Sequence, residues 1–224
     1  MYSRNPGECV YVPDTELTVR ADQIAIEAHS TTDARYGRWM YIVHPHMGAQ
    51  RVKDEGYGDV VQAVALLHDT VEETRKNKDA STHESPNSLL LKLLHDEVPE
   101  MQSPSMLVNS SLGVSVLDAL IIVDAVDAMT DVPGERRSVK LARAKQNPVA
   151  RVVDSLGDAG SHIDYNEWKL EQRFRRSSAK KRIKRYKGDQ EFHGELPSPE
   201  DMEVYLDKER QRVARQLSSK LVLF

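Results

Sequence analysis

The chain has 224 residues, of which 39% are hydrophobic, 6% aromatic and 29% charged, and its formal net charge is −4. This length is enough for one domain with a substantial core, and the shortage of aromatic residues favours helices over sheets. The net charge excludes a chain that is basic throughout, so contacts with phosphate groups have to come from local basic clusters. A single cysteine, Cys9, excludes an intrachain disulfide and a metal site built from several thiolates.

The N-terminal part of the chain alternates between helix-forming stretches and breakers. Residues 1–20 predict an irregular leader, because proline and glycine interrupt them and no apolar signal-peptide core is present. A short helix is expected over 22–29. A residue before proline avoids helical backbone, so we expect one element to end at His44 and the next to begin at Pro45. Residues 59–67, DVVQAVALL, predict a buried helix with an acidic first turn.

The remainder predicts helices separated by polar breaks, with a loop over 75–88. Helices are expected over 88–98, 115–129, 135–145 and 199–217, and a further helix begins at Pro148 with Asn147 as its N-cap. No convincing period-two strand is present, which predicts an all-α helical bundle. We divide the chain into the leader 1–20, a main domain over 21–190, and a C-terminal helix within 191–224 that packs on that domain.

The segment AVALLHDTVEE, residues 63–73, ends an apolar run with a histidine, an aspartate and two glutamates. His68 and Asp69 can both ligate one metal ion, since imidazole and carboxylate suit Zn, Mn or Fe. His44 is a candidate third ligand because Pro45 would fix its position. Asp154 or Asp158 is a candidate fourth ligand, and spacing alone leaves both open because the two share a helix face.

Glu72 and Glu73 follow the His-Asp pair, and at i+4 from His68 the first of them shares its helix face. A carboxylate beside a metal site can orient water and move protons, which is the layout of a metal-dependent hydrolase. The alternative interpretation is the polar end of a buried helix. That interpretation is weakened because the polar residues follow AVALL without a breaker.

Spaced segments of the chain resemble the HD-domain phosphohydrolases, which are named after the His-Asp pair. Within them the chain looks closest to the hydrolase domain of the RelA/SpoT homologues, including the small stand-alone alarmone hydrolases. The segments are His29 and Arg35 with YIVHP at 41–45, ALLHDTVEET at 65–74, VDAMT at 126–130, and NPVARVV at 147–153 leading into Leu156-Gly157-Asp158. The likeness covers roughly residues 22–165 and implies that the main domain is an HD-type hydrolase domain, an HD-domain helical bundle.

The resemblance selects Asp158 over Asp154. It implies that one metal ion, usually Mn²⁺ in these hydrolases although another divalent metal could replace it, is bound by His44, His68, Asp69 and Asp158. Glu72 and Glu73 take the place of the acidic pair that activates water and assists proton transfer in the family.

The resemblance also implies a substrate pocket that includes Arg35, Tyr36, Ser155 and His162. Arg35 lies where the family places a residue against the guanine base. The chain departs from the family at four positions: Tyr36 and Ser155 stand where lysine is usual, His162 where asparagine lies near the ribose, and Glu73 where aspartate is usual. The metal set therefore matches the family, whereas the substrate pocket has drifted.

The activity implied is metal-dependent hydrolysis of guanosine tetra- or pentaphosphate with release of the 3′-pyrophosphate, an alarmone reaction of the stringent response. Alternatives are an HD phosphatase acting on a nucleoside monophosphate or NADPH, and a non-catalytic nucleotide-binding regulatory module. We expect a cytoplasmic protein whose partner is a nucleotide substrate, with no membrane span and with room for an oligomer.

A basic segment covers residues 173–187. It could bind the phosphates of a nucleotide or of a nucleic acid. The alternative, which we favour, is a solvated helix face. The segment has too few aromatic residues for stacking on single strands, so we expect no nucleic-acid partner.

Overall fold

The computed structural model describes residues 5–9, 11–30, 35–76, 86–94, 114–172 and 176–221. Within these residues the fold is all-α, which confirms the expected fold class. The strands described are β1 (Arg35–Tyr36) and β2 (Trp39–Met40), which pair as a short antiparallel hairpin. Gly37 adopts φ +69° at the hairpin turn, a conformation that glycine tolerates without strain.

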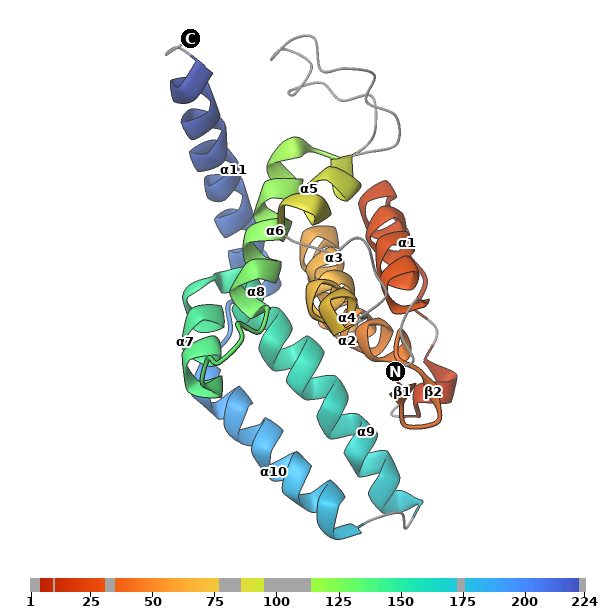
Figure 1. The fold of residues 1–224 in the computed structure, drawn as a ribbon. Helices are drawn as coiled ribbons and strands as arrows, with labels where there is room; N and C mark the ends of the chain where they lie inside the picture. The colour runs from red at the N-terminus through yellow and green to blue at the C-terminus, as the bar shows by residue number, and fades with distance from the viewer. Residues whose placement is uncertain are drawn as a thin grey trace.

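Helices account for most of the described chain (Figure 1). They are η1 (Pro6–Glu8), α1 (Glu16–Ser30), α2 (Val43–Asp54), α3 (Asp59–Leu67), α4 (Thr70–Lys76), α5 (Pro86–Leu94), α6 (Val116–Met129), α7 (Arg137–Gln146), α8 (Pro148–Val152), the π-helical η3 (Val153–Ala159), α9 (Gly160–Glu171), α10 (Arg176–His193) and α11 (Pro199–Leu221). The pair α9 and α10 extends as a helical hairpin at one end of the molecule (Figure 1).

Helix α3 lies at the centre of the core. Every residue from Val60 to Leu67 is buried, because the helix is apolar around most of its circumference and α1, α2 and α6 pack against it. Burying each of its large aliphatic side chains contributes about 1.5–3 kcal/mol to stability. The residues that follow α3, His68 and Asp69, are therefore held in position by the packing of this helix.

Local sequence signals set several helix boundaries as expected. Helix α3 has the predicted bounds. Asn147 caps α8 by accepting a hydrogen bond from the Ala150 N–H at 3.0 Å, and Pro148 occupies the first helical position. Ser115 caps α6 in the same way by accepting a hydrogen bond from the Leu117 N–H.

Two predicted boundaries were wrong. Residues 1–20 are not an irregular leader throughout, because α1 begins at Glu16, where the Thr15 hydroxyl accepts a hydrogen bond from the Thr18 N–H. His44 does not end an element, since it lies in the first turn of α2 and its N–H donates to the Tyr41 carbonyl at 2.8 Å. Pro45 is tolerated there because the first helical N–H groups have no intrahelical partner to lose.

The C-terminal helix α11 packs on the rest of the fold. Met202 and Leu206 are buried and belong to the same core as α3, and α11 contacts α6.

Some of the predicted segments lie mostly outside the described residues. They are the loop expected over 75–88, the end of the helix expected over 88–98 and the first three residues of the basic segment. No helix within the described ranges is long and apolar enough to cross a membrane.

Candidate metal centre

The His-Asp pair lies at a break between two helices. Helix α3 ends at Leu67 and α4 begins at Thr70, so His68 and Asp69 form the connecting turn. Glu72 lies in α4 beyond this turn, and His68 keeps right-handed helical backbone angles of φ −56° and ψ −35°. His68 is buried, and its Nδ1 lies 2.8 Å from the Ala65 carbonyl. Because a carbonyl can only accept, Nδ1 carries the hydrogen, and in the neutral ring Nε2 presents a lone pair.

His44 reaches the same point from the first turn of α2. Its Nδ1 lies 2.9 Å from the Ser161 hydroxyl, which itself donates to the Asp158 carbonyl at 2.9 Å. Since the serine hydrogen is already used, the serine oxygen accepts from His44 Nδ1. The Nε2 lone pair of His44 then faces His68 Nε2 at 3.2 Å.

Asp158 comes from the π-helical turn η3. Its Oδ1 lies 3.3 Å from His44 Nε2, and Asp69 Oδ2 lies 3.4 Å from the same nitrogen. Helix α2 approaches η3 closely because glycines meet there: a Cβ on Gly48 would lie 3.3 Å from backbone atoms of Gly157. This contact sets the separation between His44 and Asp158.

The structure places the three other side chains suggested as ligands around His44 Nε2. They belong to two overlapping groups that could each hold a metal ion, His44–His68–Asp69 and His44–Asp158–His162, so His162 joins the candidate ligands. Neighbouring ligands of an ion with bonds of about 2.0–2.2 Å lie about 3.3 Å apart in a tetrahedral arrangement and slightly closer in an octahedral one. The separations of 3.2–3.4 Å around His44 Nε2 fit that requirement. When His44 and His68 are neutral with the hydrogen on Nδ1, their Nε2 lone pairs lie beside carboxylate oxygens, which is a donor set that fits a cation.

The pKa values of the group show how strongly it attracts positive charge. Burial alone would lower the pKa of His68, but the adjacent Asp69 and Asp158 carboxylates raise it to about 9. Burial alone would raise the pKa of Asp69, but the neighbouring His68 and His44 hold it well below its usual range. A proton can supply the charge that this cluster needs, and a metal ion would displace it.

Tyr41 also touches the cluster, although sequence reasoning did not select it. Its hydroxyl donates to Asp69 Oδ2 at 2.8 Å, and this contact orients the carboxylate. Its sequence position could have indicated this role, because Tyr41 lies three residues before His44 and both residues therefore face the same side where the chain enters α2. Ser161 was missed as well, since nothing in its sequence context distinguishes it from other buried serines.

The two glutamates differ in their surroundings. Glu72 Oε1 accepts hydrogen bonds from the Asp131 N–H at 2.6 Å and from Lys140 Nζ at 3.1 Å. Burial and the nearby Asp69 charge raise the pKa of Glu72, and Lys140 opposes this rise. Glu73 is 3% exposed, so its carboxylate is enclosed rather than open to a substrate.

The expected substrate-binding residues do not form one group. Tyr36 is buried, with its hydroxyl 3.1 Å from the Ser161 carbonyl and 3.2 Å from His162 Nδ1. His162 belongs to one of the two candidate metal-binding groups, with Nε2 3.3 Å from Asp158 Oδ1 and its ring stacked on His44. Ser155 is buried, and its carbonyl accepts a hydrogen bond from Gln190, whereas Arg35 is exposed at the start of β1.

Asp154, the alternative fourth ligand, lies apart from the cluster and pairs with His193 at the end of α10. The geometry therefore separates the two aspartates that spacing left open. No protein-family model, curated protein or solved structure matches the chain.

Proposed function

We propose that the chain is a divalent-metal-dependent phosphohydrolase. The observation that carries the proposal is the contact of His44 Nε2 with His68 Nε2 and with the Asp69 and Asp158 carboxylates, within two overlapping groups able to hold a metal ion. Mn²⁺ is the ion we expect, because imidazole nitrogen and carboxylate oxygen ligands suit it, and Zn²⁺ and Fe²⁺ fit the same ligands. When bound, the ion would supply Lewis-acid chemistry to water and to a phosphoryl group.

Glu72 is the residue best placed to handle protons. It lines a cavity and has a raised pKa, so its carboxylate takes up a proton more readily than an ordinary glutamate. Lys140 holds Glu72 Oε1 in position through the contact at 3.1 Å. Glu73 is enclosed and supports the turn between α3 and α4 through its N–H, which donates to the Asp69 carbonyl at 2.9 Å.

The substrate that we favour is guanosine tetra- or pentaphosphate, with release of the 3′-pyrophosphate. This choice rests on the resemblance to the RelA/SpoT hydrolase domain. Tyr36, Ser155 and His162 depart from that family, so another nucleotide, such as NADPH or a nucleoside monophosphate, is the second candidate. In both cases the reaction hydrolyses a phosphate ester and releases phosphate or pyrophosphate.

The test starts from protein stripped with a chelator and reloaded with Mn²⁺. Bound metal is measured by elemental analysis, and phosphate or pyrophosphate release is measured with guanosine tetraphosphate, NADPH and nucleoside monophosphates. His44→Asn should lose most of the metal and all turnover. His46→Asn is the matched control, because His46 lies two residues away on the same helix and contacts Asp22 at 2.6 Å instead of the cluster.

Failure of the wild-type protein to bind any divalent metal would refute the metal centre. Metal binding without turnover of any substrate would favour the non-catalytic nucleotide-binding module. Equal metal loss in the His44 and His46 variants would show that the cluster is not the binding site.

A further inference from the structure

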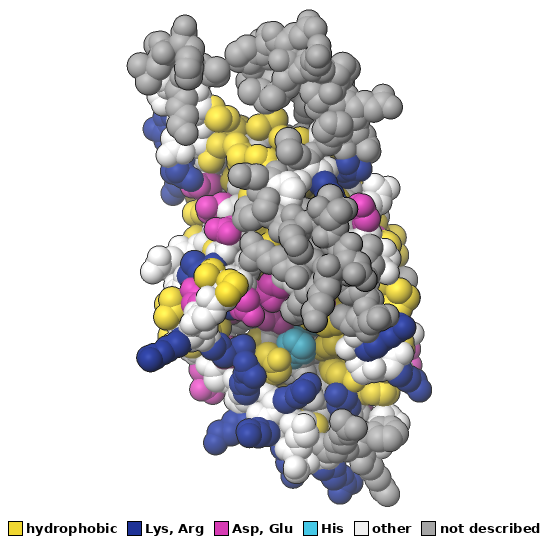
Figure 2. Space-filling model, viewed as in Figure 1, with side chains coloured by type: hydrophobic (Ala, Val, Ile, Leu, Met, Phe, Trp, Pro, Cys, Tyr) yellow, Lys and Arg dark blue, Asp and Glu magenta, His cyan; other side chains and the backbone are white. Residues whose placement is uncertain are grey.

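A groove of about 570 Å³ lies between α9 and α10, and none of its lining residues belongs to the metal cluster. Three of them are lysines of α10, namely Lys180, Lys184 and Lys187. They follow one another at intervals of four and three residues, so they lie on one face of the helix. We call these three residues the lysine stripe. Figure 2 shows lysine and arginine side chains gathered over the lower part of the molecule, the region that α9 and α10 occupy in Figure 1.

The charge pattern of α10 differs from that of an ordinary exposed helix. Residues 176–188 contain seven lysines and arginines and no acidic residue, in a chain whose net charge is −4. Helix α11 shows the ordinary pattern, in which a cation pairs with an acid one turn away, as Arg212 does with Glu209. Like charges four residues apart repel and destabilise a helix, so α10 keeps a pattern that costs stability unless an anion binds to it.

The cations of the lysine stripe are available to a partner. Lys180 and Lys184 are exposed, and they form no ion pair within the part of the chain that the structure describes. Lys187 is 56% exposed and lies 3.9 Å from Glu167, which is a long separation for an ion pair. Glu191, the other acid of the groove, follows Lys187 by one helical turn. Both glutamates therefore lie near one end of the groove, and the end with Lys180 and Lys184 is purely basic.

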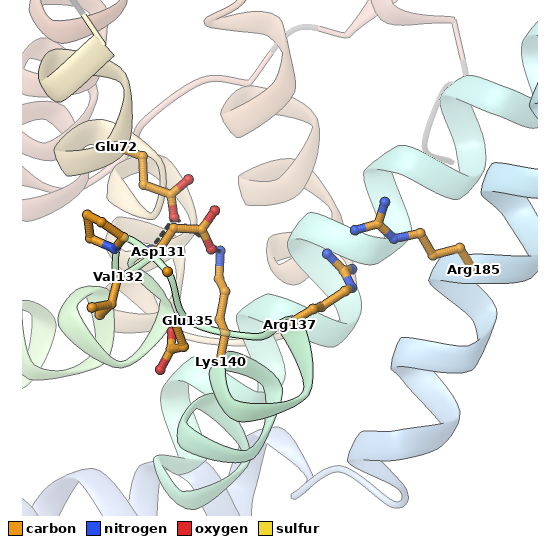
Figure 3. Close-up of a pocket in the computed structure, with 9 residues that line it drawn as sticks. Glu72, Asp131, Val132, Glu135, Arg137, Lys140 and Arg185 are labelled. Atoms are coloured by element: carbon orange, nitrogen blue, oxygen red, sulfur yellow. Dashed lines mark hydrogen bonds and ion pairs between the residues drawn. The ribbon is translucent and has the colours of Figure 1, made fainter.

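The other sides of α10 face the rest of the fold. Tyr186 stacks on His162 with ring centroids 4.4 Å apart, which ties the helix to the metal centre. Figure 3 shows Arg185 beside Arg137, in the separate cavity that Glu72 also lines. A partner bound to the lysine stripe therefore needs no residue of the metal centre and no residue of that cavity.

We propose that the lysine stripe binds the sugar-phosphate backbone of a nucleic-acid duplex. From Lys180 to Lys187 the helix axis rises by about 10 Å. One strand of a duplex presents about three phosphates over that length, so the number of lysines matches the number of phosphates. This inference does not depend on the proposed function, because the metal centre takes no part in it.

The composition of α10 favours a duplex over other polyanions. The expectation that the chain has no nucleic-acid partner considered stacking on single strands, whereas the backbone of a duplex is bound through charge and needs no stacking. None of the exposed residues in 176–188 carries an apolar side chain, and an anionic membrane surface is bound by helices that have an apolar face.

The test measures the binding of fluorescein-labelled DNA and RNA duplexes of one sequence to the full chain by fluorescence anisotropy, at KCl concentrations from about 50 to about 200 mM. For the wild-type protein, log K should fall with log[KCl] with a slope at least as steep as about −2.7, since three neutralised phosphates release counterions. Binding of either duplex supports the proposal, and the ratio of the two affinities identifies RNA or DNA as the source of the backbone.

The double variant Lys180→Gln with Lys184→Gln should bind more weakly, with a slope that is shallower by about 1.8, because two phosphate contacts are lost. The loss should be the same on duplexes of unrelated sequence, since backbone contacts carry no sequence information. The helix content of the variant and its affinity for Mn²⁺ should equal those of the wild type, because neither lysine belongs to the metal cluster.

The matched control is Lys208→Gln with Arg215→Gln, which removes the same charge from exposed positions of α11. The control should keep the wild-type slope. Equal losses in the two double variants, or a wild-type protein that binds neither duplex at the lowest salt concentration, would overturn the proposal. Polyglutamate that displaces the duplex at equal charge concentration would instead assign the lysine stripe to an acidic protein, which also overturns it.

Discussion

Ser161 accepts a hydrogen bond from His44 Nδ1 at 2.9 Å while it donates to the Asp158 carbonyl at 2.9 Å. One hydroxyl thus fixes the ring of one candidate ligand and binds the backbone of another. Ser161 is fully buried, so water cannot replace it without opening the fold. A partner of this kind sets which imidazole nitrogen faces the other candidate ligands.

We predict that Ser161→Ala weakens Mn²⁺ binding by about 10- to 100-fold with little change in helix content. The alanine fills the same space but cannot accept from His44 Nδ1, so the ring can adopt the other tautomer. Metal titration monitored by fluorescence or calorimetry measures the loss. Ser155→Ala is the control, because Ser155 is also buried but accepts the hydrogen bond from Gln190 through its backbone carbonyl, which alanine keeps. Equal affinities for the two variants would contradict the positioning role of Ser161.

We predict that Gly48→Ala lowers the free energy of unfolding by about 1–3 kcal/mol and also weakens metal binding. The added methyl group would meet backbone atoms of Gly157 at 3.3 Å, and the backbone can yield only if α2 moves away from η3. That movement separates His44 from Asp158. Urea unfolding and metal titration give the two readouts.

Gly188→Ala serves as the matched variant for that substitution. A Cβ at position 188 has no heavy atom within 4 Å, and the residue lies inside α10, so alanine should stabilise the protein by about 0.5–1 kcal/mol. A Gly48→Ala protein as stable as the wild type, with unchanged metal affinity, would show that α2 and η3 are not limited by this contact.

We predict that the buried His29 makes stability depend on pH. Burial lowers its pKa to about 4 in the folded state, from 6.5 for an ordinary histidine. The unfolded chain therefore binds more protons between pH 6.5 and 4, and stability present above pH 6.5 is lost as the pH falls through this range. At pH 5 the loss due to His29 alone is about 2 kcal/mol.

The measurement is the free energy of urea unfolding of wild-type protein and of His29→Phe at pH 7.5 and pH 5. Phenylalanine keeps the aromatic packing against Tyr41, whose ring centroid lies 5.3 Å away, but it cannot take up a proton. The difference between the two proteins should shift in favour of the variant as the pH is lowered. Parallel pH curves would show that His29 does not contribute to the loss of stability.

We predict that Leu206→Ala destabilises the protein by about 2–5 kcal/mol, because it removes a side chain that is 1% exposed from the contact between α11 and the core. Val204→Ala on the same helix should change stability by less than about 0.5 kcal/mol, since that side chain is 53% exposed. Thermal or urea unfolding separates the two. Similar effects for both substitutions would contradict the docking of α11 through Leu206.

Much of the helical framework could be predicted because its signals are local. The apolar pattern of 59–67 and the Asn147-Pro148 start signal act within a few residues, and both elements formed as expected. The start of α1 was missed, although Thr15 and Glu16 carry a cap signal, because the breakers before them dominated the interpretation. The break at His68 and Asp69 was also missed, since an apolar helix running into polar residues gives no local sign of a turn.

The sequence by itself determined an all-α fold and the set of residues able to bind a metal, because residue chemistry and helical periodicity are written in the chain. Only the tertiary structure decided which of them meet: Asp158 joins His44, whereas Asp154 pairs with His193. It also placed Ser161 against His44 and Tyr41 against Asp69. These contacts depend on how α2 packs against α9 and on the turn after α3, and packing brings together side chains that are more than a hundred residues apart.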